Sequence, residues 1–229
     1  MPPTVSSAPC HDESRLTLRV LVLLCPLLLQ AQQTLPKLYP IDESSRDGSF
    51  QSFVSRLRSA VEARNTKALR KLLDEDIVVG AEKEDQGWRK FVERWKPNDP
   101  HTPLWPALAD MLQLGFIREQ PDLYLSPYVV WRFPQHLDRR LYRVIARDNV
   151  PLREAPSLNA PVRARLAFDI VKPTGDPVRS EGLARFVPIE TGDGQRGFVS
   201  QGDLLSPLLP RAQFAFRQKR WIMVALEGD

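Results

Sequence analysis

The chain has 229 residues, of which 42% are hydrophobic and 26% are charged, and its formal net charge is +4. This composition is close to that of ordinary globular proteins, and the length suffices for one or two domains with cores of their own. The charge is small and includes no dense run of Lys or Arg. We therefore expect no nucleic-acid partner, because tracking a phosphate backbone requires a dense basic surface.

Residues 1–31 have the pattern of a secretory targeting segment. Arg15 and Arg19 precede an apolar run at residues 20–29, and Ala31 is the small residue before the first plausible cleavage point. That run is short, whereas a helix that crosses a bilayer needs about 20 apolar residues. We expect the segment to be removed on export, which leaves a periplasmic or secreted protein without a transmembrane segment. The alternative is a buried N-terminal helix.

Both cysteines, Cys10 and Cys25, lie inside this segment. The mature chain is therefore expected to have no thiol, so its fold does not depend on disulfides. The same absence excludes a cysteine peptidase, because that mechanism needs a thiolate nucleophile.

Residues 32–136 are predicted to form a helical α+β region. Ser49 is the expected N-cap of a first helix, whose apolar stripe consists of Phe50, Phe53, Val54, Leu57 and Val61. Similar spacing predicts helices over residues 88–95 and 105–112, and a short strand is expected at residues 77–79. Such stripes usually form a protein core rather than a ligand site.

Residues 123–131 are expected to be extended. Pro127 lies within this segment, and proline cannot donate a hydrogen bond to a β-ladder. The segment is therefore predicted to be an edge strand.

After a polar link at residues 135–140, the apolar period changes to that of strands. The predicted strands lie at residues 141–145, 150–152, 164–171, 186–189 and 197–200. Several short strands without a helix between them are typical of a small β-barrel. The predicted fold class is therefore α+β, with a helical N-terminal region and a C-terminal barrel.

The barrel segment resembles bacterial SH3 domains. Residues 149–157, N-V-P-L-R-E-A-P-S, match the usual opening N-V-x-[LV]-R-x-x-P-S. Residues 160–162 and 194–200 follow in the family's order, which ends in a G-x-x-G-[YFW]-V turn and strand, and residues 204–205 match its closing helical turn. Phe186 replaces the family's Trp, and the loop before it is longer.

The resemblance covers residues 141–207 and implies an SH3-like barrel that binds peptides or cell-wall polymers. It does not imply catalysis. On this basis we expect Phe186 and Phe198 to make apolar contacts with the ligand, and Arg153 or Arg196 to bind carboxylates. The alternative is that the two phenylalanines fill the barrel interior and that Arg153 braces a turn.

Residues 211–228 are a predicted β-hairpin. Its second strand is apolar at every position from 221 to 226, so both of its faces need to be covered. The hairpin can complete the N-terminal region, in which case the barrel is an insertion in a discontinuous α+β domain.

No catalytic, cofactor or metal site is recognisable in the sequence. The G-x-G-x-x-G run at residues 192–197 is followed by a strand pattern rather than by the helix of a dinucleotide site, so we interpret Asp193 and Gly194 as a hairpin turn with positive φ. His136 and Asp138 supply two metal ligands at most, whereas zinc needs three or four.

The preferred hypothesis is a non-catalytic exported binding or scaffolding protein of the cell envelope. Its partner is a peptide, a cell-wall polymer or another envelope protein. The alternative is a periplasmic enzyme whose site lies in the N-terminal region, with Trp88, Trp95 or Trp131 lining a pocket. A pocket with convergent ionisable groups favours the enzyme, whereas a core filled by tryptophan opposes it.

The export hypothesis predicts a defined new N-terminus. N-terminal sequencing of protein from its native cells is expected to begin at Gln32, immediately after the cleavage point. An intact Met1 on the folded protein would contradict the hypothesis.

Overall fold

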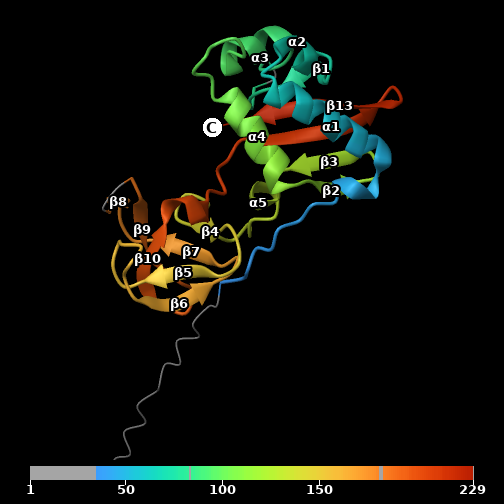
Figure 1. Ribbon diagram of the computed structural model, residues 1–229. Helices are drawn as coiled ribbons and strands as arrows, with labels where there is room; N and C mark the ends of the chain where they lie inside the picture. Colours follow the sequence, from blue (N-terminus) through green and yellow to red (C-terminus); the bar gives the residue numbers. More distant parts are fainter. Residues whose placement is uncertain (1–34, 83, 181–182, 229) are drawn as a thin grey trace, which may run out of the picture. The chain divides into compact units, whose positions relative to one another are not determined.

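Figure 1 shows the computed structural model of the chain, which describes residues 35–82, 84–180 and 183–228. The expected targeting segment, residues 1–31, lies outside the described residues, as do both cysteines. The described chain contains helices and two β-sheets, one of five strands and one of eight. This confirms the α+β class.

Helix α1, Gly48–Glu62, carries the apolar stripe that the sequence predicts. Its buried side chains include Phe50, Phe53, Val54, Leu57 and Val61. The N-cap is Asp47 and not the expected Ser49, because the Asp47 carboxylate accepts hydrogen bonds from the backbone N–H groups of Ser49 and Phe50. Aspartate and serine are both favoured N-caps, so the apolar pattern alone does not distinguish them. A short 3-10 helix, η1 (Ser44–Arg46), precedes α1.

Two short elements follow α1. Helix α2 spans Thr66–Arg70, and its N-cap is Asn65, whose side-chain oxygen accepts a hydrogen bond from a backbone N–H of the first turn. Strand β1, Leu73–Val78, begins earlier than the expected strand at residues 77–79. The strand begins earlier because its pairing with strand β13, Arg220–Glu227, already begins at Leu73.

Helices α3, Trp88–Trp95, and α4, Leu104–Leu114, confirm the two further helices expected from the apolar spacing. Phe91 and Trp95 are buried on α3, and α4 likewise buries one face. These side chains form one hydrophobic cluster with those of α1 and of the five-stranded sheet.

Strand β2, Ile117–Gln120, is followed by β3, Leu123–Ser126, where the expected extended segment ends. The residues after it form the short helix α5, Tyr128–Trp131. The edge position predicted from Pro127 is wrong, because β3 lies between β2 and β12, Arg211–Arg217. Pro127 follows the last residue of the strand, so its missing N–H removes no hydrogen bond from the ladder.

The terminal hairpin supplies two strands of the first sheet. Strand β12 is followed by β13, Arg220–Glu227, and the strand order is β1-β13-β12-β3-β2 (Figure 1). Strand β13 runs parallel to β1, and β12 runs antiparallel to β3. The sheet therefore combines strands from both ends of the described chain.

Aromatic side chains join this hairpin to α1. Phe50 stacks on Tyr124 of β3 with ring centroids 3.7 Å apart, and the edge of Trp221 on β13 approaches it at 4.9 Å. The Trp221 indole N–H also donates to the Ser49 hydroxyl at 2.9 Å. Edge-on pairs such as that of Phe50 and Trp221 add stabilisation beyond their buried area, and the stack of Phe50 on Tyr124 adds contact area, so this cluster holds α1 on the sheet.

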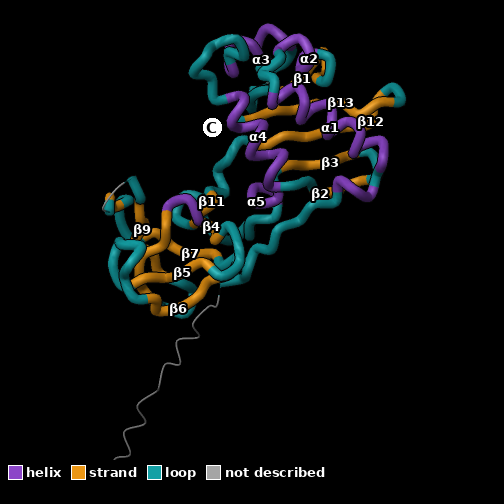
Figure 2. The backbone as a smooth tube through the Cα atoms, viewed as in Figure 1, coloured by secondary structure: helices purple, strands orange, loops and turns teal. Residues whose placement is uncertain are grey.

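The second sheet contains eight strands, which are orange in Figure 2 like those of the first sheet. They are β4 (Arg143–Ile145), β5 (Val150–Arg153), β6 (Val162–Leu166), β7 (Ile170–Pro173), β8 (Val178–Arg179), β9 (Arg185–Glu190), β10 (Arg196–Ser200) and β11 (Leu204–Leu205). The single strand expected at residues 164–171 is divided between β6 and β7, because the chain turns at Phe168, whose φ is 58°. Leu204 and Leu205 were expected in a helical turn, but they form β11 and the 3-10 helix η2, Gln201–Asp203, precedes them.

The strand order of the second sheet is β11-β4-β7-β9-β10-β5-β6, with β8 paired to β9. A closed barrel requires a ladder between the first and last strands of this order. In the parts of the chain that the structure describes, β11 pairs with β4 and β6 pairs with β5, and no closed barrel is found. The SH3-like barrel expected for residues 141–207 is therefore not confirmed, and the eight strands form one sheet whose core includes Val150, Leu152 and Ile189.

A further hydrophobic cluster contains residues from both sheets. Ile117 and Leu125 of the first sheet, Tyr128 of α5, and Val144 and Ile170 of the second sheet all belong to it. All described residues fall within one unit of the chain. The second sheet is therefore packed against the first region and not only tethered to it.

The N-cap of α1 generates a prediction about pH. The hydrogen bond from the Ser49 hydroxyl, opposed by burial and assisted by backbone N–H groups, holds the pKa of Asp47 below its ordinary value of 3.8. The cap therefore stabilises the fold above this ordinary value, and the stabilisation is lost as the pH falls through the lower folded-state pKa. Asp47→Ala is expected to cost about 1 kcal/mol at neutral pH, with a loss that shrinks in acid.

Denaturant unfolding at several pH values measures this effect. Asp47→Asn is the matched control, because asparagine retains the capping oxygen without the charge, and it is expected to retain most of the stability. An Ala variant whose loss stays constant as the pH falls below 3.8 would contradict the assignment of the cap.

Candidate functional site

The four residues expected to bind a ligand lie on one face of the second sheet. Phe198 of β10 pairs with Arg153 of β5, and Arg196 is two positions from Phe198 on the same strand. Phe186 of β9 shares this face because its pairing partner, Ser200, is again two positions from Phe198. The hydrophobic core of the sheet is built from alternate residues that point to the opposite face.

The two arginines of this face already have partners within the protein. Arg153 Nη1 donates to the carbonyl oxygen of Ala160 at 2.8 Å, across the turn between β5 and β6. Arg196 Nε lies 2.6 Å from a carboxylate oxygen of Glu190. The geometry of Arg153 corresponds to the alternative in which it braces a turn.

The two phenylalanines differ in accessibility. Phe186 is 1% exposed, and Val178 of β8 pairs beside it. Phe198 is half-buried and keeps part of its ring at the surface. Neither residue belongs to the main hydrophobic cluster of the second sheet. Phe186 is nevertheless fully buried, as the alternative supposed, whereas Phe198 is only partly buried.

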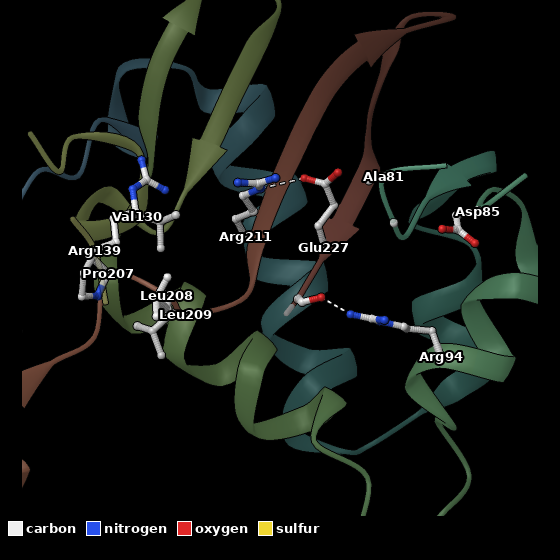
Figure 3. Close-up of a pocket in the computed structure, with 12 residues that line it drawn as sticks. Ala81, Asp85, Arg94, Val130, Arg139, Pro207, Leu208, Leu209, Arg211 and Glu227 are labelled. Atoms are coloured by element: carbon white, nitrogen blue, oxygen red, sulfur yellow. Dashed lines mark hydrogen bonds and ion pairs between the residues drawn. The ribbon is translucent and has the colours of Figure 1, made fainter. Parts of the chain in front are cut away.

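A cavity of about 330 Å³ lies elsewhere, at the end of the first sheet (Figure 3). Strands β12 and β13, helices α3 and α5, the loop after β1 and the two connections to the second sheet contribute to its wall. The charged residues of the wall are Asp85, Arg94, Arg139, Arg211 and Glu227, and its apolar residues include Val130, Leu208 and Leu209.

Two of these charged groups form a fixed pair. Arg211 Nε lies 2.7 Å from a Glu227 carboxylate oxygen, as Figure 3 shows, and the Arg211 guanidinium stands 5.7 Å from the centre of the Trp131 ring. Arg94 donates to the backbone carbonyl of Gly228. Arg211, Glu227 and Arg94 therefore each have a partner within the protein.

Asp85 and Arg139 differ from Arg211 and Glu227 in that they form no ion pair among the described residues, 35–82, 84–180 and 183–228. Figure 3 places them on opposite sides of the cavity, with the pair of Arg211 and Glu227 between them. The Asp85 carboxylate accepts a hydrogen bond from the Glu82 backbone N–H at 3.4 Å. The cavity thus presents this carboxylate and the Arg139 guanidinium to a ligand, with apolar side chains beside them.

Other chemistry has little support in the described residues. His101 and His136 are both exposed, and no group of three or more His, Cys, Asp or Glu side chains within this part is arranged to hold a metal ion. Likewise, none of its helices is both long enough and apolar enough to span a bilayer.

The tryptophans of the enzyme hypothesis pack in the protein. Trp95 is 4% exposed and its indole N–H donates to the carbonyl of Leu226 at 3.2 Å. Trp88 packs against the same core, and Trp131 packs on the cluster between the sheets. These three side chains stabilise the fold and do not line the cavity in Figure 3.

Sequence reasoning missed the cavity because its charged residues are far apart in the chain. Asp85, Arg139 and Glu227 lie in three separate segments, and no spacing rule connects them. The one available signal is that Asp85 and Arg139 are charged residues in loops, where functional residues are common.

Comparison of this chain with protein-family models, with curated proteins and with solved structures found no match.

The contact of Arg153 gives a prediction that separates bracing from ligand binding. Arg153→Ala is expected to lower the free energy of unfolding by about 1 kcal/mol, because it removes a hydrogen bond from a half-buried guanidinium. Arg179→Ala, on an exposed position of β8, is the matched control and is expected to change stability little. Unchanged thermal unfolding of Arg153→Ala together with weaker retention on isolated cell walls would indicate ligand binding instead.

Proposed function

We propose that this chain is a non-catalytic binding protein of the cell envelope that holds a peptide, or the peptide part of a cell-wall polymer, in the cavity of Figure 3. The observation that carries the proposal is the placement of Asp85 and Arg139 on opposite sides of one cavity. A peptide segment with a free amine and a carboxylate carries the complementary pair of charges. Such a peptide would be bound by its two opposite charges and by apolar contacts with the wall.

The size of the cavity and the residues of its wall suit a small peptide segment as the ligand. Its volume of about 330 Å³ is near the lower end of the range of about 300–1,000 Å³ that is common for ligand sites. Val130, Leu208 and Leu209 offer apolar contacts, and the guanidinium of Arg139 can bind a carboxylate through two parallel hydrogen bonds. The fixed pair of Arg211 and Glu227 keeps the wall in place without the ligand.

The resemblance to bacterial SH3 domains is part of the same proposal. Gly194 has φ 84°, as a hairpin turn requires, and a Cβ at Gly197 would lie 2.6 Å from the carbonyl oxygen of Arg153. Both glycines of the G-x-x-G run are therefore needed for the local backbone. We infer that residues 141–207 act as an SH3-like module beside the cavity, with Phe198, Arg153 and Arg196 as a second contact surface.

An envelope location is the remaining part of the proposal. It is supported by the charged-then-apolar order of the first 31 residues. A binding protein that reaches cell-wall material needs such export.

The binding proposal is tested by retention on isolated cell walls at low salt. Arg139→Ala and Asp85→Asn are each expected to weaken retention by roughly tenfold, because each removes a charged hydrogen-bonding partner of the ligand. Retention is also expected to fall as ionic strength rises. Arg140→Ala, on the exposed neighbour of Arg139, is the matched control and should bind as the unaltered protein does.

Two outcomes would contradict the proposal. One is no retention of the unaltered protein at low salt, and the other is equal loss in Arg139→Ala and Arg140→Ala. If Arg153→Ala and Arg196→Ala lose retention while Arg139→Ala does not, the binding surface is the sheet face and not the cavity.

A further inference from the structure

A groove of about 530 Å³ lies on the first region, away from the cavity of Figure 3. The last turns of α1, the short helix α2 and the beginning of β13 contribute the residues of its wall. Its residues differ from those of the cavity at every position, so it is a separate site.

All charged residues that line this groove are positive. Arg56, Lys71 and Arg220 line it, and no Asp or Glu does. None of the three takes part in an ion pair among the residues that the structure describes. Three cations around one hollow repel each other, and an anion bound between them relieves that repulsion.

The remainder of the wall is small and largely apolar. Ala60 and Leu72 are 2% and 6% exposed and form buried parts of the wall, and Ala63 and Ala68 flank them. Short side chains leave room for a ligand, and their methyl groups favour an apolar one. An inorganic anion would use the cations but not this surface.

We propose that the groove binds a small free amphiphile, an organic anion with an alkyl chain and a carboxylate or phosphate head. The head lies between Lys71 and Arg220, and the chain lies on the alanine and leucine wall. This assignment is independent of the cavity and of the ligand proposed for it.

Calorimetric titration of the full chain with three monomeric probes tests the ligand class. Octanoate has both the chain and the negative charge, octylammonium has the chain with the opposite charge, and acetate has the charge alone. Octanoate is expected to bind, and the other two are expected to bind much more weakly.

A double variant tests the site. Lys71→Gln combined with Arg220→Gln is expected to weaken octanoate binding by roughly tenfold, since each exposed pair contributes up to about a fivefold factor. Lys67→Gln combined with Lys219→Gln is the matched control, because it removes the same net charge from α2 and the hairpin turn outside the groove. It is expected to change the affinity less than about twofold. Thermal unfolding confirms that both double variants are folded.

Several results would overturn the proposal. They are no heat of binding with octanoate, equal binding of octanoate and octylammonium, equal binding of acetate, or equal losses in the two double variants. Binding to anionic phospholipid vesicles without binding to octanoate would indicate a membrane-contact surface instead. Arg139→Ala is expected to leave octanoate binding unchanged, which separates this proposal from that for the cavity.

Discussion

The pairing of the terminal hairpin with the first sheet is the constraint on which the rest of the structure depends. Strands β12 and β13 lie between β3 and β1, and β13 is buried over most of its length, including Trp221 and Met223. A strand with apolar side chains on both faces is stable only inside a sheet that is covered on both sides. The sheet that the helices of the first region cover is therefore complete only when β12 and β13 have paired with β3 and β1.

This pairing also determines where the connections to the second sheet begin and end. Ala212 pairs with Ser126, so the chain leaves the first sheet and returns to it at neighbouring positions. The outgoing connection carries Arg139, and the returning connection carries Leu208 and Leu209. The cavity forms where these connections meet the sheet end. It is thus a consequence of the topology.

Besides the two chain connections, the segment that contains Lys37 and Leu38 also contacts the second sheet. Lys37 bridges to Asp169, with its ammonium 2.7 Å from the carboxylate, and the Leu38 N–H donates to the carbonyl of Phe168 at 2.8 Å. Leu38 is also buried in the cluster that contains residues of both sheets. Two chain connections and this segment together restrict the second sheet, and a wall built from several segments can then keep its shape.

The sequence by itself determined the elements whose signals are local. The spacing of Phe50 and Leu57 predicted α1, because side-chain period follows directly from backbone geometry, and the apolar run at residues 221–226 predicted the second strand of the hairpin. Only the tertiary structure decided the rest. It placed the hairpin inside the first sheet, started β1 at Leu73, and arranged the strands of residues 141–207 in one sheet, in which no closed barrel is found among the described residues. It also brought Asp85 and Arg139 to one cavity, since contacts between distant segments depend on packing and not on local period.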